Sequence, residues 1–490
     1  TLFRSHLTDI KKYERCPRAF WLSRRQKKEF VPFVNYNESM SELVKQLLMI
    51  REEDAFVGKA NDSGELALQA LHEKKVLIHA RFVYEDLRIN VPFLVQEDGR
   101  RILYFTYRSC FPKEHGAVRM AQYLAVLEKL GVSIDAVYAI HLNAAYVRGK
   151  ELDVRQLLIV DEYLYNGKNK AHKTIRELLD KQEIDLDAML EKLHACEAMD
   201  DIPVKRSHVC TRGGKCMYYD DCFPEEPADD SILNLVQAAQ KYDMHEEGIT
   251  TLRDADIDRI EGTRHQYAQI MAARNHGLYV DKGALRCWKK AHIQTPVSYL
   301  DFEWETYAFP PYEGMKPFDV LVFQYSLHIE EQQELRHVGF IGERDCRRAF
   351  LEHLLAHIPK TGTILVYNME GAEKLRLVQL AQQFPEYEER LRAVWERMVD
   401  LSLPFSTGNV YDIRMAGFYS LKRLVPVFSD YSYQDLEISY GMDAVEKWRE
   451  YCTADAEKKQ EIYGQLEQYC AMDTYAEYIV YHALEDMMRD

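Results

Sequence analysis

The segment Ser298–Glu305 constrains the fold of this chain more than any other, because it combines the apolar character of a buried strand with carboxylates at a fixed spacing. Successive side chains of a strand point to opposite faces, so Asp301 and Glu303 share one face and the apolar residues flanking them share the other. Two neighbouring carboxylates on an apolar strand repel each other, and a bound cation relieves that repulsion. The alternative, in which one of the two acids simply faces solvent, is equally compatible with the pair alone.

The residues around this segment predict a mixed succession of strands and helices. This βββαβα order is that of an RNase H-like fold, in which helices cover the faces of a mixed sheet. The expected elements are the strands Val297–Trp304, Val320–Ile329 and Leu335–Ile341, the helix Cys346–His357, the strand Thr363–Tyr367 and a helix that begins near Ala372.

Three polar residues farther along the chain complete a set of motifs. Glu373 follows the end of the last predicted strand, and Tyr469 and Asp473 are four residues apart, which places them on one face of a helix. Together with Asp301 and Glu303 they resemble the motifs of the DnaQ-like (DEDD) 3′–5′ exonucleases. Those motifs are D-x-E, a later acid that follows an Asn, and Y-x3-D in the Tyr subclass.

The second motif departs from the pattern of that family. An aromatic residue usually precedes its acid, whereas Ala372 precedes Glu373, and the stretch is one residue longer, so Glu370 is an alternative ligand. The wider stretch Tyr299–Ala476, including Phe418–Lys422, resembles the C-terminal domain of a bacterial family of unknown function. Members of that family fuse a RecB-like domain to an RNase H-like domain.

The resemblance implies hydrolysis of phosphodiester bonds with two metal ions. In such sites carboxylates hold two divalent ions about 3.5–4 Å apart, and Mg²⁺ or Mn²⁺ suits ligation by oxygen alone. By this match the ligands are Asp301, Glu303, Glu373 and Asp473. Tyr469 would orient the attacking water, because a phenol with a pKa near ~10 is a poor base.

The cysteines indicate a second metal centre. The chain has ten cysteines, too few for a disulfide scaffold in 490 residues, and three of them cluster at Cys210, Cys216 and Cys222, whereas Cys16 lies far upstream. One early and three late cysteines resemble the iron–sulfur nucleases of the RecB/AddB type, in which four thiolates hold a [4Fe–4S] cluster. Four thiolates also suit zinc, which stays an alternative.

The active-site positions of that nuclease family are altered. The family has an Asp on one strand, E-x-K on the next and Gln-Tyr on a helix. Pro92 stands in place of the Asp, and Thr106 and Arg108 in place of the Glu and Lys, whereas Gln122 and Tyr123 persist. Pro and Thr cannot supply the charged oxygen ligands that Mg²⁺ needs, and Arg replaces a tunable Lys poorly. We therefore expect this region to have lost nuclease activity and to keep a nucleic-acid-binding shape.

These patterns place the chain in the α/β class and divide it into three parts. We expect a PD-(D/E)XK-like domain with a four-cysteine metal cluster at 1–227, a helical connector at 228–295 and an RNase H-like (DEDD exonuclease) domain at 296–490. The elements expected in the first part are a helical stretch at Leu7–Lys27, strands at Val76–Val91 and Ile102–Tyr107, a helix at Val118–Leu130 and a strand at Ala136–Leu142.

The charge of the chain restricts how it contacts nucleic acid. It has 63 basic and 79 acidic side chains, and the resulting net charge of -16 argues against wrapping of duplex DNA by bulk charge. No apolar run approaches the ~18 residues of a membrane helix, and the start has no apolar signal region, so we expect a cytoplasmic protein without a membrane partner. The residues expected to contact nucleic acid are Lys11, Lys12, Arg15, Arg18, Arg108, Gln122, Lys205, Arg206, Arg212 and Lys215.

The leading interpretation is a metal-dependent 3′–5′ exonuclease in the C-terminal domain. The N-terminal domain would act as a clamp on nucleic acid, with single strands or 3′ ends as the expected substrate. DNA is favoured over RNA, although the composition does not decide between them. The alternative is a non-catalytic binding or assembly subunit with a protein partner in a repair or defence complex. The complete set of carboxylates favours the enzyme.

Overall fold

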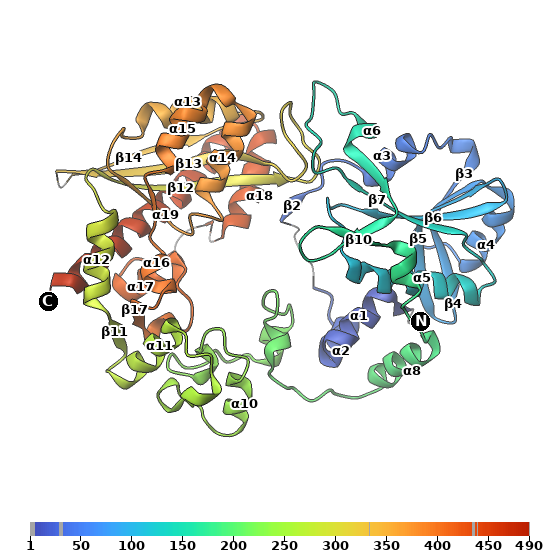
Figure 1. Cartoon of the computed structure of the whole chain (residues 1–490), viewed down its shortest axis with the longest axis horizontal. Coiled ribbons are helices and arrows are strands. Elements are labelled where there is room, and N and C mark those ends of the chain that lie inside the picture. Colours follow the sequence, from blue (N-terminus) through green and yellow to red (C-terminus); the bar gives the residue numbers. More distant parts are fainter. Residues whose placement is uncertain (1–4, 29–32, 333, 434–436, 439, 490) are drawn as a thin grey trace. The chain divides into compact units, whose positions relative to one another are not determined.

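The computed structural model describes residues 5–28, 33–332, 334–433, 437–438 and 440–489, and it is a mixed α/β protein. The chain divides into two compact units (Figure 1). The segment 228–295, which the sequence analysis separates as a connector, belongs to the second unit. The first unit comprises Thr1–Lys205, Thr211–Cys222 and Tyr307–Asp319, and the second comprises Arg206–Cys210, Phe223–Thr306 and Val320–Asp490.

A mixed sheet forms the centre of the first unit. Its strand order is β3-β4-β5-β6-β7-β8, with β1 beside β5. β4, β5 and β6 are antiparallel neighbours, whereas β6 and β7 are parallel. The strands are β1 (Ser5–His6), β3 (Ala55–Val57), β4 (Val76–Tyr84), β5 (Leu87–Glu97), β6 (Arg100–Tyr107), β7 (Ala136–Leu142) and β8 (Leu158–Asp161), and β9 (Tyr163–Tyr165) pairs with β10 (Ala171–Thr174).

Helices cover both faces of this sheet. Apolar residues of β4 and β6, such as Leu77 and Leu103, pack on one face against α1, α4, α5 and α8. Ile78 of β4 packs on the other face with α3, α6 and Phe309. The helices are α1 (Leu7–Arg15), α2 (Pro17–Arg25), α3 (Met40–Leu47), α4 (Gly64–Glu73), α5 (Ala117–Lys129), α6 (Val154–Leu157), α7 (Ile175–Leu179), α8 (Leu186–Glu197) and α9 (Tyr219–Cys222).

Two elements of the first unit differ from the predicted ones. The helical stretch expected at Leu7–Lys27 is two helices, because the backbone is extended at Cys16, with φ -163°, immediately before Pro17. A proline disfavours helical backbone in the residue that precedes it, so the helix ends there. The strand expected at Val76–Val91 is instead the beginning of a hairpin, which turns near Glu85, a residue with a left-handed φ of 52°.

The sheet of the second unit has β12 between antiparallel and parallel neighbours. Its strand order is β14-β13-β12-β15-β16. β12, β13 and β14 are antiparallel, whereas β15 runs parallel to β12 and β16 parallel to β15. The strands are β12 (Val297–Tyr307), β13 (Val320–Glu331), β14 (Glu334–Ile341), β15 (Thr363–Val366) and β16 (Met398–Asp400), and β11 (Leu278–Val280) pairs with β17 (Val410–Asp412).

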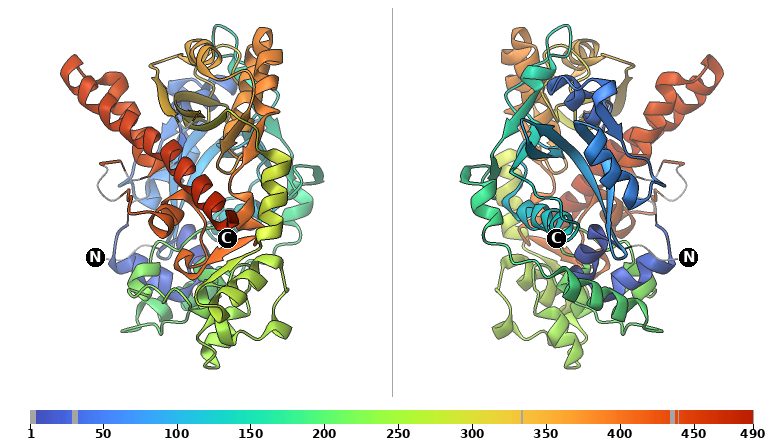
Figure 2. Two further views of the ribbon diagram at one scale, coloured as in Figure 1. Left: turned by 90° about the vertical axis from the view of Figure 1, so that its left-hand side faces the viewer. Right: turned by 90° about the vertical axis from the view of Figure 1, so that its right-hand side faces the viewer.

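Different helices cover the two faces of this sheet. α13, α14 and α15 pack on one face around Leu300 and Phe302, whereas α11, α12, α17 and α19 pack on the other around Tyr299 and Leu365. α19 runs for 34 residues and is the long red helix of Figure 2. The helices are α10 (Lys241–Glu246), α11 (Arg264–Arg274), α12 (Lys282–His292), α13 (Arg347–His357), α14 (Glu373–Gln383), α15 (Glu388–Trp395), α16 (Leu403–Ser406), α17 (Leu421–Phe428), α18 (Gly441–Thr453) and α19 (Ala456–Arg489).

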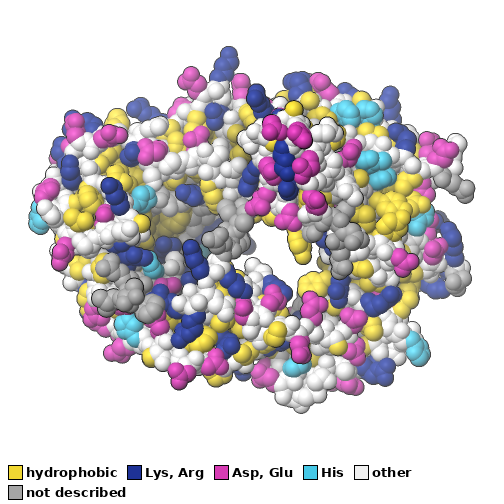
Figure 3. Space-filling view, turned by 180° about the vertical axis from the view of Figure 1, so that it is seen from behind, with side chains coloured by type: hydrophobic (Ala, Val, Ile, Leu, Met, Phe, Trp, Pro, Cys, Tyr) yellow, Lys and Arg dark blue, Asp and Glu magenta, His cyan; other side chains and the backbone are white. Residues whose placement is uncertain are grey.

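Two further features concern the apolar character of the helices and the distribution of charge on the surface. Among the described residues, no helix combines the length and the apolar character needed to span a membrane. Basic and acidic side chains are interspersed on the face that Figure 3 shows. Contact of that face with a polyanion would therefore depend on small groups of basic residues.

Candidate metal centre

The strand β12 positions the two acids of the D-x-E pair inside the second unit. Its residues Leu300 and Phe302 are buried in the core beneath α13 and α14, so the alternation of a strand turns Asp301 and Glu303 toward the opposite face. The pairing of β12 with β13 shifts in register directly after Glu303. Such a bulge bends the strand and re-aims the side chains next to it.

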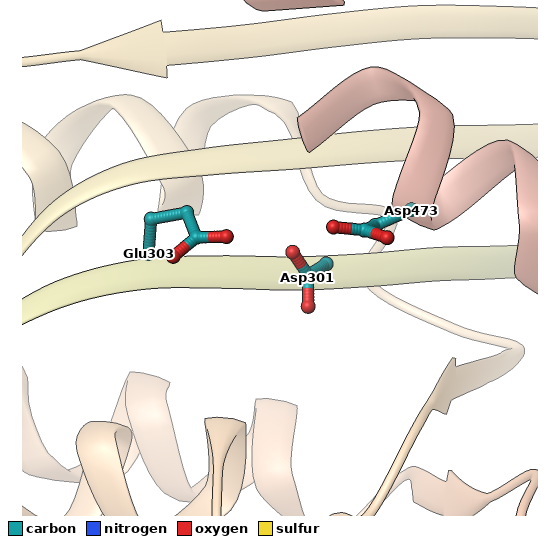
Figure 4. Close-up of side chains that lie close together, drawn as sticks. All are labelled: Asp301, Glu303 and Asp473. Carbon is teal, nitrogen blue, oxygen red and sulfur yellow. The ribbon is translucent and has the colours of Figure 1, made fainter. Parts of the chain in front are cut away.

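The helix α19 brings a third acid to the same place. One carboxylate oxygen from each of Asp301, Glu303 and Asp473 lies within 4.8 Å of the others (Figure 4). Glu303 and Asp473 are buried, and Asp301 is half-buried. In the part of the chain that the structure describes, no other three His, Cys, Asp or Glu residues come together so closely. Carboxylates at this spacing repel one another unless they are protonated or bind a cation.

Glu373 is the acid of the second motif that turns toward this centre. It begins α14, it is 1% exposed, and its Oε2 has no hydrogen-bond partner among the described residues. Burial raises the pKa of Glu373 well above its ordinary value, and the charge of Asp301 adds to the rise, so the two carboxylates lie near each other. Glu370 is exposed and pairs with Lys374 at 2.6 Å. The geometry therefore favours Glu373 over Glu370 as a ligand.

Glu477 is a further buried carboxylate that the sequence analysis misses. It lies one helical turn after Asp473 on α19 and is fully buried, and both of its carboxylate oxygens lack a hydrogen-bond partner within the described residues. Burial raises the pKa of Glu477 well above its ordinary value, and the charges of Asp301, Glu373 and Asp473 add to the rise. Its spacing of four residues from Asp473, which puts both on one helix face, is the signal that could have found it.

Burial also raises the pKa values of the first three carboxylates. For Asp301 the charge of Asp473 adds to the effect of burial, and for Glu303 the charge of Asp301 does so, which holds both pKa values well above the ordinary range. Burial raises the pKa of Asp473 from 3.8 to about 6, although a hydrogen bond from Tyr433 and the charge of Lys422 lower it. Carboxylates perturbed in this way favour either bound protons or a bound cation.

Tyrosines and one lysine surround the acidic centre. The hydroxyl of Tyr433 donates to Oδ1 of Asp473 at 2.8 Å. Nζ of Lys422 donates to the hydroxyl of Tyr469 at 3.3 Å and lies 5.2 Å from the centre of its ring. Burial and the charges of the nearby carboxylates raise the pKa of Tyr469 far above its ordinary value, so its hydroxyl keeps its proton. No motif of the sequence assigns a role to Lys422 or Tyr433.

Two other buried acids of the second unit have structural roles. Glu305, on the same strand as the D-x-E pair, accepts hydrogen bonds from Nε and Nη2 of Arg449 at 2.6 and 2.8 Å. Asp400 accepts hydrogen bonds from three backbone amides between 2.8 and 3.2 Å. These complete sets of partners distinguish the two residues from Glu373 and Glu477, which have unsatisfied buried oxygens.

None of the four cysteines expected to hold a cluster forms a disulfide bond within the described residues. Cys16, Cys216 and Cys222 belong to the first unit and Cys210 to the second. Burial raises the pKa of Cys222, and the charges of Cys16 and Cys216 add to the rise, so these three are neighbours. Their sulfurs do not form a group within 4.8 Å, whereas two sulfurs on one tetrahedral zinc lie about 3.8 Å apart. These thiols therefore do not form a compact group within the described residues, and the iron–sulfur cluster, with zinc as its alternative, stays a prediction.

Some of the residues that correspond to the active-site motif of the resembling nucleases lie close together in the first unit. Pro92 on β5, Thr106 on β6 and Tyr123 on α5 line one cavity, which no Asp or Glu of the described residues lines. Gln122 is buried. The guanidinium of Arg108 lies 4.8 Å from the centre of the Tyr36 ring. Among the described residues, no carboxylate lines this cavity to hold a divalent ion.

Several basic residues expected to contact nucleic acid have partners within their own unit. Such contacts leave less of their charge for phosphate, and the role of these residues stays a prediction. Lys12 pairs with Asp9 at 3.4 Å, Arg18 with Asp201 at 2.8 Å and Lys215 with Asp220 at 2.7 Å, Arg15 donates to the carbonyl of Arg212 at 3.1 Å, and the guanidinium of Arg206 lies 3.8 Å from the centre of the Phe223 ring.

A comparison with known families finds a match over part of the chain. Residues 298–420 match the model of a domain of unknown function, DUF2779. The match includes Asp301, Glu303 and Glu373 but ends before α19. No curated protein and no solved structure matches the chain. The match agrees with the expectation of a domain of unknown function and assigns no activity.

Proposed function

We propose that the second unit is a metal-dependent nuclease that removes nucleotides from the 3′ end of nucleic acid, with DNA favoured. The observation that carries the proposal is the set of buried carboxylates on β12, α14 and α19, of which Glu373 and Glu477 have buried oxygens without a hydrogen-bond partner among the described residues. The strand order β14-β13-β12-β15-β16, with helices on both faces, supports an RNase H-like architecture for this unit.

The side chains present fit hard divalent ions. Mg²⁺ and Mn²⁺ prefer oxygen ligands, and the centre offers carboxylates with unsatisfied buried oxygens at Glu373 and Glu477. Asp301, Glu303 and Asp473 would hold one ion, and Asp301 lies near Glu373 and Glu477 for a second. Two such ions, when bound, supply Lewis-acid stabilisation of the charge that develops on the phosphate and the leaving oxygen.

The remaining polar residues have roles that follow from their protonation. Tyr469 keeps its proton, so it serves as a hydrogen-bond donor that orients the attacking water and does not act as a base. Lys422 adjoins this hydroxyl and carries a positive charge toward the same centre. Its ammonium would contact a non-bridging oxygen of the scissile phosphate, where negative charge is present before and during the reaction.

The first unit would hold the nucleic acid and not cut it. Pro92 and Thr106 stand where the resembling nucleases carry acids, and the cavity that they line has no carboxylate among the described residues. Cys16, Cys216 and Cys222 of this unit would supply thiolates to the expected iron–sulfur cluster.

The proposal is tested by the metal dependence of cleavage. Labelled single-stranded DNA and RNA are incubated with the full chain in Mg²⁺, Mn²⁺ or EDTA, and the wild type is compared with Asp301→Asn. We expect shortening products with Mg²⁺ or Mn²⁺, none in EDTA, and a loss of cleavage in Asp301→Asn with binding retained. Glu370→Gln removes an exposed acid of the same segment that pairs with Lys374, and it is the matched control that should cleave normally.

Two results would contradict the proposal. Cleavage that survives in Asp301→Asn would place the reaction elsewhere in the chain. Binding without cleavage of either polymer, in every metal, would instead favour the non-catalytic binding subunit.

A further inference from the structure

A cavity of about 330 Å³ lies in the first unit between β5, β6 and the helices α1 and α5. Its lining includes two arginines, Arg88 and Arg119, and two histidines, His6 and His79, together with neutral polar side chains. No Asp or Glu of the described residues lines it. The volume is at the lower end of the ~300–1,000 Å³ that is typical of small-molecule sites.

The surroundings of the cavity are positively charged. Burial lowers the pKa of His6, and the charge of Arg88 lowers it further. Burial likewise lowers the pKa of His79, with a further contribution from Arg108. Asp9 acts on His6 in the opposite direction, but its carboxylate already accepts the backbone amide of His6 at 2.9 Å. An anion in the cavity would therefore meet cationic neighbours on more than one side.

The side chains also offer hydrogen-bond donors from several elements. Arg119, on α5, is exposed, and its Nη2 lies 3.5 Å from the hydroxyl of Tyr123. Thr106 of β6 and Asn90 of β5 add a hydroxyl and an amide to the lining. Guanidinium groups bind phosphate oxygens through paired N–H donors, and hydroxyls and amides complete such sites.

We propose that this cavity binds a phosphomonoester, such as the terminal phosphate of a nucleic-acid strand or of a free nucleotide. A divalent cation does not fit it, because the lining has arginines where a metal site needs carboxylates. The site is separate from the acidic centre of the second unit, and its occupancy does not require cleavage.

Binding of short oligonucleotides tests this site. The full chain is titrated, in EDTA to prevent cleavage, with the same single-stranded tetranucleotide carrying either a 5′-phosphate or a 5′-hydroxyl, and affinity is measured by calorimetry. Hydrogen bonds to charged groups are worth enough to change affinity about tenfold or more, so the phosphorylated strand should bind at least about tenfold more tightly. Adenosine monophosphate and inorganic phosphate form separate arms that tell a strand end from a free nucleotide.

Substitutions of residues that line the cavity test whether the phosphate binds there. Arg119→Gln should remove most of the preference for the phosphorylated strand, and Thr106→Val should reduce it with little change in side-chain volume. Arg100→Gln is the control, because Arg100 is exposed on the same unit and does not line the cavity. Equal affinity for both strands with no binding of nucleotide or inorganic phosphate would overturn the proposal, and so would a preference unaffected by both Arg119→Gln and Thr106→Val.

Discussion

Replacement of Asp473 by Asn should stabilise the metal-free protein at neutral pH. The folded protein raises the pKa of Asp473 from 3.8 to about 6, so between these values it binds protons that the unfolded chain has released. At about 1.4 kcal/mol per pKa unit, ionisation of this one buried group costs about 3 kcal/mol of stability above pH ~6. Asparagine carries no charge, and its carbonyl oxygen can still accept the hydrogen bond from Tyr433.

The difference in unfolding free energy between Asp473→Asn and the wild type should increase with pH. Well below pH 3.8 the carboxyl is protonated in both the folded and the unfolded state, so the variant and the wild type should be equally stable there. The advantage of Asp473→Asn should reach about 3 kcal/mol near pH 8 and should be roughly half as large near pH 5. Because four of the five tryptophans lie in the second unit, urea unfolding followed by their fluorescence in EDTA reports on this unit.

Metal and a control variant complete the test. In saturating Mn²⁺ the order should reverse, because the wild type gains the free energy of ion binding and the variant loses a ligand. Glu370→Gln, which removes an exposed acid, should change stability by less than about 0.5 kcal/mol at every pH. An Asp473→Asn protein that is destabilised in EDTA at neutral pH, or stabilised equally at all pH values, would refute the reasoning.

Four further changes probe the same centre and the cysteines. Glu477→Gln should weaken Mn²⁺ binding about 10- to 100-fold in a calorimetric titration, and unchanged affinity would show that this acid is only a buried neutral group. Glu373→Gln should abolish cleavage whereas Glu370→Gln should not, and the reverse result would exchange their roles. Lys422→Met should slow single-turnover cleavage about 10²-fold with substrate binding largely kept. Cys216→Ser should remove the brown colour and the visible absorbance of an iron–sulfur cluster, and wild type with stoichiometric zinc and no iron would exclude that cluster.

Local pattern predicts the strand that carries the acids and the helix that carries the third motif. The alternation around Asp301 marks β12, and the spacing of four between Tyr469 and Asp473 marks one face of α19. Both signals are short-range, because strand and helix periodicity depend only on neighbouring residues. Pro17 also carries a short-range signal, since proline restricts the residue before it. The expectation of one helical stretch at Leu7–Lys27 did not take this signal into account.

Residues that reach the centre from elsewhere in the chain have no such signal. Lys422 and Tyr433 approach Asp473 from segments 40 to 51 residues away, so only the packing of α17 and the chain that follows it against α19 reveals their roles. Glu477 shares one helix face with Asp473 through a spacing of four residues, but that spacing alone does not distinguish it from other charged residues of a long helix. Its complete burial and its unsatisfied oxygens depend on β12 and α14, which lie far from it in the chain.

The polarity of digestion tests the central claim most directly. One single-stranded oligonucleotide is labelled separately at its 5′ end and at its 3′ end and is digested by the full chain in Mn²⁺. A 3′–5′ exonuclease predicts a ladder of progressively shorter products from the 5′ label and immediate release of a labelled mononucleotide from the 3′ label. Internal cuts from the first time point, loss of the 5′ label first, or no cleavage at all would contradict the account.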